Sequence, residues 1–306
     1  MTTHLSPASD QPIPIRERLT REVEMLPVLP HVVTRILDID PASETAFDEL
    51  VQLLESEPNY AVRLVAAANS VATRGVSTIT RIRDAVVRLG VREVSNLLMS
   101  MAVVRVFVPR SDWERGLWTH AIEVGSVARA LARHSNLGLD HERAYLTGLL
   151  HDVGRFILFN LAPASLREVD EAEWHSPAEL VAAERSICGM DHAELGALVC
   201  ARWSVPTHFV DFVRVHHAPD VEARLPGEAG RIARLVQVAD LAGFSAVSRR
   251  HGLTSFLDLS PADAERLIRS AIPSWFHRTT GLVQTVGAAL EAADSLAHHL
   301  GLRPKR

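Results

Sequence analysis

Cysteine, aromatic residues and lysine are all scarce in this chain of 306 residues. Its two cysteines, Cys188 and Cys200, cannot build a disulfide framework, and the first residues lack the pattern of a signal peptide. We therefore expect a cytoplasmic protein. Aromatic residues make up only 5% of the chain, which disfavours an aromatic-rich β-sandwich or barrel. Lys305 is the only lysine, and we interpret this as a coding bias rather than a functional signal.

The chain also lacks long hydrophobic runs and an excess of positive charge. Its most apolar stretch, residues 97–108, is interrupted by Ser100 and Arg105 and is too short to be a span of ~20 apolar residues. The formal net charge is −5, whereas binding to a phosphate backbone needs a basic surface. We therefore expect no membrane association and disfavour nucleic acid as a partner. A third hypothesis, a nucleic-acid-linked regulator, is supported only by scattered arginines such as Arg81, Arg83 and Arg88.

Apolar residues at helical spacing run through most of the chain, and no strand-like alternation occurs. In the first half they predict helices over residues 31–38, 47–54, 60–70, 79–89 and 91–104, with a boundary at 109–113. In the second half they predict helices over 117–134, 142–161, 177–187, 192–203, 207–217 and 229–248, and at least two more within 261–300. The sequence therefore predicts an all-α fold, in which the partner of the last helix is unknown.

Histidine is the residue in excess, with 15 in the chain. Eight of them lie in tails, caps or polar stretches, and we expect these to be solvated: His4, His31, His134, His141, His175, His251, His298 and His299. Others lie beside apolar residues within predicted helices and are accompanied by two aspartates. Seven residues stand out in this way: His120, His151, Asp152, His192, His216, His217 and Asp240.

Imidazoles and carboxylates together are suitable ligands for Zn, Mn, Fe or Ni, and an aspartate can bridge two ions. Two ions ~3.5–4 Å apart activate a water for attack on phosphorus, so phosphoester hydrolysis is the chemistry expected of such a site. The alternative is that each histidine is a hydrogen-bonded core residue, which holds for most buried polar groups taken singly. Seven such residues together favour a metal site. His208 follows Pro206 closely and is left out, because Phe209 beside it supplies a packing role.

Several short motifs resemble those of the HDOD family, a signalling branch of the HD-domain superfamily. They are LPVLP at 26–30, EP at 57–58, ANS at 68–70, AVVRLG at 85–90, GLLHDVG at 148–154, Glu184, GMDHAELG at 189–196, WSVP at 203–206 and HH at 216–217. The resemblance covers most of residues 19–245. It implies a bacterial regulatory protein, with an N-terminal helical bundle packed on an HD-like helical core.

In this interpretation residues 1–14 are a flexible tail and residues 19–245 are the HDOD domain. The domain divides into an N-terminal helical subdomain, residues 19–110, and an HD-like subdomain with the metal site, residues 113–245. Residues 246–306 form a C-terminal helical extension. We expect no receiver or other sensor domain before the HDOD domain, and therefore expect its input from a signalling protein partner or a nucleotide ligand. A homodimer is a further alternative for the oligomeric state.

The seven residues match the ligand set of the related HD-GYP cyclic-dinucleotide phosphodiesterases. The resemblance implies that His120, His151 and Asp240 hold one metal ion and that His192, His216 and His217 surround a second. It makes Asp152 the bridge between the two ions and a catalytic residue. The lysine of the relatives is replaced by Arg155, which we expect to bind phosphate bidentately as a second catalytic residue.

The chain departs from those phosphodiesterases at two further points. The histidine pair is followed by Ala218, Pro219 and Asp220, so the Gly-Tyr-Pro element is absent, and Gly116 replaces the glutamate that supports a third metal in some relatives. We therefore expect two ions at most. The first hypothesis is a signalling module that acts through protein contacts and carries a di-metal site. The second is a metal-dependent phosphohydrolase that resembles a cyclic-dinucleotide phosphodiesterase.

Overall fold

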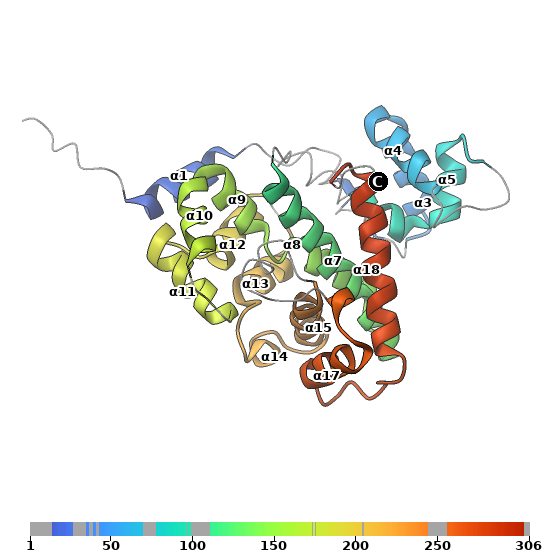
Figure 1. Cartoon of the computed structure of the whole chain (residues 1–306). Helices are drawn as coiled ribbons and strands as arrows, with labels where there is room; N and C mark the ends of the chain where they lie inside the picture. The colour runs from blue at the N-terminus through green and yellow to red at the C-terminus, as the bar shows by residue number, and fades with distance from the viewer. Residues whose placement is uncertain are drawn as a thin grey trace, which may run out of the picture.

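The computed structural model describes residues 14–26, 35–36, 39–40, 43–69, 78–95, 97–98, 111–172, 174, 176–203, 205–243 and 256–302. Within these ranges every regular element is helical and no strand occurs, which confirms the predicted all-α fold (Figure 1). Outside the described residues lie 31–34 and 37–38 of the predicted helix over 31–38, 96 and 99–104 of the one over 91–104, and 109–110 of the boundary at 109–113. The same holds for residues 1–13 of the predicted tail.

The first half contributes the helices α1 (Ile15–Met25), α3 (Ala46–Glu55), α4 (Pro58–Ala68) and α5 (Ile82–Leu89). The last three pack together, and buried leucine and valine side chains at helical spacing, such as Leu50, Leu54 and Val86, fill the space between them. α1 instead lies against the second half. Arg16 of α1 pairs with Glu194 and donates to the carbonyl oxygen of Gly189.

The long helix α7 (Asp112–Ser135) is the centre of the second half, with α8 (His141–Leu150), α15 (Glu228–Ala242) and α18 (Leu282–His299) packed against it. The predicted helix over 142–161 is wrong at its middle, because α9 (Val153–Leu161) is separate from α8. Asp152 between them has φ −100° and ψ 17° and lies outside the regular helix. The interruption lets His151 and Asp152 turn towards the same interior region.

The remaining helices of this half are α10 (Pro163–Glu171), α11 (Pro177–Cys188), α12 (His192–Arg202), α13 (Thr207–Val215) and α14 (Val221–Arg224). α12 packs against both α9 and α13. The Asp191 side chain accepts from the backbone N–H of Glu194 at 2.8 Å and so caps the N-terminus of α12. α13 ends two residues earlier than predicted, so His216 and His217 lie in the turn that follows it.

Two contacts between glycine backbones set the spacing of these helices. A Cβ atom on Gly148 would lie 2.7 Å from the Cα of Gly125, so the backbones of α8 and α7 touch. A Cβ atom on Gly154 would lie 1.9 Å from the carbonyl oxygen of His192, which brings α9 equally close to α12. Only glycine permits either approach.

The C-terminal residues return to the centre of the fold. After a short 3₁₀ turn at Phe256–Asp258 and α17 (Pro261–Ala271), α18 runs along α7, which therefore is the partner that the sequence left unknown (Figure 1). His134 of α7 stacks on Phe276 and meets the Thr285 hydroxyl at 3.1 Å. His134 is thus half-buried, and the expectation that it is solvated is wrong.

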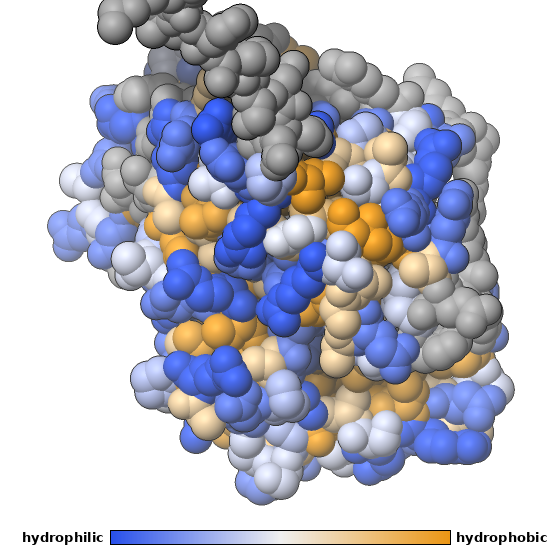
Figure 2. Space-filling view, turned by 90° about the vertical axis from the view of Figure 1, so that its left-hand side faces the viewer, coloured by the Kyte–Doolittle hydropathy of each residue, from blue (hydrophilic) through white to orange (hydrophobic). Residues whose placement is uncertain are grey.

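The surface mixes polar and apolar side chains. On the face at the α1–α11 end of the molecule, hydrophilic residues are interspersed with smaller hydrophobic areas (Figure 2). Among the residues that the structure describes, no helix is both long enough and apolar enough to cross a membrane.

Candidate metal centre

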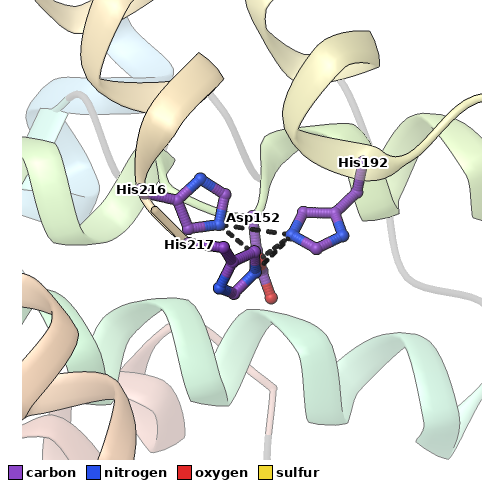
Figure 3. Close-up of side chains that lie close together, drawn as sticks. All are labelled: Asp152, His192, His216 and His217. Atoms are coloured by element: carbon purple, nitrogen blue, oxygen red, sulfur yellow. Dashed lines mark hydrogen bonds and ion pairs between the residues drawn. The ribbon is translucent and has the colours of Figure 1, made fainter. Parts of the chain in front are cut away.

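Four of the predicted ligands form one group, called here the four-residue cluster: Asp152, His192, His216 and His217 (Figure 3). One donor atom from each lies within 4.8 Å of the others. His192 Nε2 is 2.9 Å from His217 Nε2 and 3.2 Å from His216 Nε2. Asp152 Oδ1 is 3.2 Å from His192 Nε2. These residues come from α12, from the turn after α13 and from the α8–α9 junction.

His120, His151 and Asp240 form a second group, the three-residue cluster. His120 Nε2 of α7 lies 3.0 Å from Asp240 Oδ1 of α15, and His151 Nε2 lies 3.8 Å from the same oxygen. Asp152 Oδ1 is 3.5 Å from His151 Nε2, so this carboxylate lies between the two clusters. The structure therefore brings together all seven residues that the sequence singled out.

The ring orientations fit a metal centre. The Nδ1 atoms of His151 and His216 each lie 2.7 Å from a backbone carbonyl oxygen, of Gly148 and Val213 respectively. Because a carbonyl oxygen can only accept, each Nδ1 carries the proton and each Nε2 faces the centre. His151 Nε2 is buried and has no hydrogen-bond partner. Metal-binding histidines show this arrangement, with the outer nitrogen donating and the inner lone pair free for an ion.

The charges in the centre are strongly coupled. Burial lowers the pKa of His151 to about 4. Burial also opposes the charged forms of His120 and His192, but the charge and hydrogen bond of Asp240 raise the pKa of His120 to about 9. The carboxylates of Glu184 and Asp152 raise the pKa of His192 to about 10. Without an ion, His120 and His192 therefore each hold an extra proton, which a cation that binds here must displace.

The centre is more open on one side than on the other. The side chains of His192 and His151 are 0% and 1% exposed, whereas that of Asp240 is 27% exposed. His217 is also half-buried rather than fully buried. Solvent, and therefore a small ligand, can approach from the Asp240 side.

Sequence reasoning assigned no role to two supporting residues, Glu184, which it named only as part of a motif, and Gln237. Glu184 of α11 accepts from both the backbone N–H and the Nδ1 of His192, at 2.9 and 2.5 Å. Gln237 of α15 donates to the carbonyl oxygens of His216 and Ala218, at 2.7 and 2.8 Å. A signal for Glu184 was available, because it shares one helix face with the buried Leu180 and Cys188.

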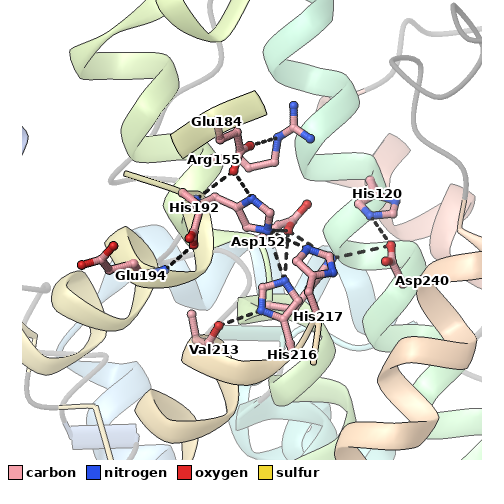
Figure 4. Close-up of polar contacts among 12 residues, drawn as sticks. His120, Asp152, Arg155, Glu184, His192, Glu194, Val213, His216, His217 and Asp240 are labelled. Atoms are coloured by element: carbon pink, nitrogen blue, oxygen red, sulfur yellow. Dashed lines mark hydrogen bonds and ion pairs between the residues drawn. The ribbon is translucent and has the colours of Figure 1, made fainter. Parts of the chain in front are cut away.

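Arg155, the predicted phosphate-binding residue, is buried beside the centre (Figure 4). Its Nη2 lies 2.7 Å from Asp170 Oδ1, and its Nε lies 3.8 Å from Glu184 Oε1. The structure therefore places its guanidinium among carboxylates of the protein itself. A role in binding phosphate stays a prediction.

Comparison with known proteins identifies the class. The HDOD domain family matches residues 26–219, which is more than half of the chain. The chain therefore belongs to the HDOD family, as its motifs predicted. An uncharacterized protein of Treponema pallidum (strain Nichols) is 28% identical over 194 residues, which cover 62% of this chain and 37% of that protein. The match thus spans little more than a third of this relative.

Two solved structures share the fold. A candidate phosphohydrolase from Shewanella amazonensis SB2B superposes with a TM-score of 0.68 at 23% identity, covering 92% of this chain and 97% of that one. A candidate signal transduction protein from Marinobacter aquaeolei VT8 superposes with a TM-score of 0.67 at 22% identity, covering 94% and 64%. At these identities the likeness establishes the fold alone.

Proposed function

We propose that this chain is a bacterial signal-transduction protein that regulates a partner through its HDOD domain and carries a centre for two divalent metal ions. One observation supports the centre above all others. Asp152 Oδ1 lies 3.2 Å from a donor atom of the four-residue cluster and 3.5 Å from one of the three-residue cluster. A carboxylate in this position can serve two ions.

In this proposal each cluster holds one ion. His120, His151 and Asp240 hold the first, and His192, His216 and His217 hold the second. Asp152 is shared between them. Nitrogen and carboxylate donors of this kind are suitable for Fe, Mn, Zn or Ni. When bound, such a pair polarises a phosphoester and lowers the pKa of a bound water.

A metal-dependent phosphohydrolase, with a cyclic dinucleotide as the substrate, is the second candidate function. The partial exposure of Asp240 favours it, because a reacting phosphoester needs access to the centre. The candidate phosphohydrolase with the same fold supports it as well. The absence of the Gly-Tyr-Pro element after His217 places it second.

Elemental analysis of the purified full chain, followed by a hydrolysis screen with linear and cyclic nucleotides, tests both functions. Two ions per chain without turnover support the signalling protein, and two ions with metal-dependent turnover support the phosphohydrolase. A metal-free protein that takes up no Mn or Fe contradicts both. His208→Ala is the matched control, since His208 lies outside both clusters, and it should keep the metal content of the wild type.

A further inference from the structure

We infer that Glu184 is a positioning residue that holds His192 in the form that binds metal, and that Arg155 acts by fixing Glu184 rather than by binding a substrate phosphate. This inference rests on the proposed metal binding. It concerns Glu184, which contacts the ligand His192 directly, and Arg155, which contacts Glu184.

Glu184 contacts His192 at two points. Its Oε2 accepts from the backbone N–H at 2.9 Å and from the ring Nδ1 at 2.5 Å. Two bonds to one residue fix the rotation of the imidazole as well as its distance from the carboxylate. Both side chains are 0% exposed, so no water competes for either bond.

The carboxylate also determines which ring nitrogen faces the centre. An ionised carboxylate can only accept, so it keeps a proton on Nδ1 and leaves the Nε2 lone pair of His192 directed at His216 and His217. Hydrogen bonding of this kind also raises the basicity of the ligating nitrogen. A glutamine at position 184 could instead donate its N–H₂ to Nδ1, which would move the proton to Nε2 and remove the ligand.

A buried carboxylate needs a positive partner, and Arg155 provides it. The guanidinium lies between two acids. Its Nε is 3.8 Å from Glu184 Oε1 (Figure 4), and its Nη2 is 2.7 Å from Asp170 Oδ1. The side chain of Arg155 is 6% exposed, that of Glu184 is 0% exposed and that of Asp170 is 1% exposed. A continuous row of charges therefore runs from α10 through α9 and α11 to the ligand at the start of α12.

This burial argues against a phosphate-binding role for Arg155. An incoming phosphate would have to displace Asp170 or Glu184 from the guanidinium, and either acid would then be left buried without its positive partner. The accessible side of the centre is at Asp240 instead. The planar guanidinium has several N–H donors and can pair with two carboxylates at once. A lysine ammonium is less suited to this position.

The test compares Glu184→Gln and Arg155→Lys with the wild-type full chain. MnCl₂ titration calorimetry gives the number of ions and their affinities, and long-range ¹H–¹⁵N spectra of the Zn-loaded protein show which ring nitrogen of His192 carries the proton. We expect Glu184→Gln to weaken one ion by about 10–100-fold and to shift the ring proton towards Nε2. We expect Arg155→Lys to act in the same direction with a smaller effect. Glu194→Gln, on the exposed side of α12, the helix that carries His192, should leave both readouts unchanged.

The outcomes separate this inference from the proposed function. A wild-type chain that binds no ion overturns the metal centre itself. If the wild type binds two ions while Glu184→Gln keeps both affinities and the His192 tautomer, the positioning role is wrong. If Arg155→Lys leaves metal affinity unchanged but weakens binding of inorganic phosphate to the metal-loaded protein, Arg155 is the phosphate ligand. Circular dichroism confirms folding, and Arg155→Lys supplies the decisive comparison should Glu184→Gln not fold.

Discussion

The two halves of the metal centre differ in how firmly the protein holds them. In the four-residue cluster, Glu184 fixes the ring of His192, the carbonyl oxygen of Val213 fixes that of His216, and Gln237 holds the turn that carries His216 and His217. In the three-residue cluster, only His151 is fixed in this way, by Gly148. His120 Nδ1 is buried without a hydrogen-bond partner, and Asp240 is partly exposed.

This difference predicts two ions of unequal affinity. A ligand whose orientation is already fixed loses less conformational entropy when an ion binds, so the four-residue cluster should bind the tighter ion. The three-residue cluster, which is closer to solvent, should exchange its ion more readily. Asp152 is common to both clusters, so its replacement should affect both ions and remove the difference between them.

Replacing Asp152 should have the largest effect. Asp152→Ala removes a donor from both sites and leaves buried histidines without a counter-charge, so we expect both ions to be lost and the melting temperature of the metal-loaded protein to fall. Metal content and thermal unfolding measure this. Asp211→Ala, an exposed aspartate on α13, is the control. Unchanged metal stoichiometry in Asp152→Ala would rule out a shared carboxylate.

The glycine contacts allow each cluster to be perturbed separately. Gly154→Ala forces α9 away from α12 and should disturb the four-residue cluster, whereas Gly148→Ala separates α8 from α7 and should disturb the three-residue cluster. We expect each to cost ~1–3 kcal/mol or more of unfolding free energy. Gly287→Ala on α18 is the control. A Cβ atom at this position would have no neighbouring atom within 4 Å, so the substitution should stabilise the helix by ~0.5–1 kcal/mol. Equal stability of all three variants would contradict the close approaches.

Chelation should reveal the difference in affinity between the two ions in the wild-type protein. Dialysis of the metal-loaded protein against increasing EDTA should remove the ion of the three-residue cluster first, giving a plateau at one ion per chain by elemental analysis. His120→Ala should abolish the weaker ion only, and His192→Ala the tighter one. Simultaneous loss of both ions from the wild type would contradict unequal affinities.

Gln237→Leu should have the smallest effect. It removes the Gln237 donor from the carbonyl oxygens of His216 and Ala218, of which Ala218 keeps the backbone N–H of Val221, and this should cost ~1–3 kcal/mol of stability. Because the histidine side chains keep their other contacts, the tighter ion should weaken less than in Glu184→Gln. Chemical denaturation and metal titration measure the two effects, with Gln52→Leu on the exposed face of α3 as the control. If Gln237→Leu weakened metal binding as much as Glu184→Gln does, the smaller role given to Gln237 would be wrong.

The sequence predicted the ligands better than the residues that hold them. His151 and Asp152 stand out because a polar pair within an apolar segment needs partners. The break between α8 and α9 escaped prediction because the apolar spacing continues through Phe156 and Leu158, and only tertiary packing reveals the turn. Glu184 was recognised as part of a family motif, but its contact with His192 joins two helices and has no signature in local periodicity.

Errors elsewhere have similar causes. The burial of His134 depends on Phe276 and Thr285, which lie more than 140 residues further along the chain. The short helix α14 has four residues, too few for a periodic pattern to be recognised. The sequence did not predict α10, which begins at Pro163, although proline is well tolerated in the first turn of a helix.

The contact of Gly154 with the backbone of His192 has a mechanical consequence. It joins α9 and α12 at the level of the main chain, so Asp152 and His192 move together and their separation does not depend on side-chain adjustment. α1 is attached to the same unit through Arg16 and Glu194. A displacement of α1 would therefore reach Asp152 and His192 together rather than either ligand alone.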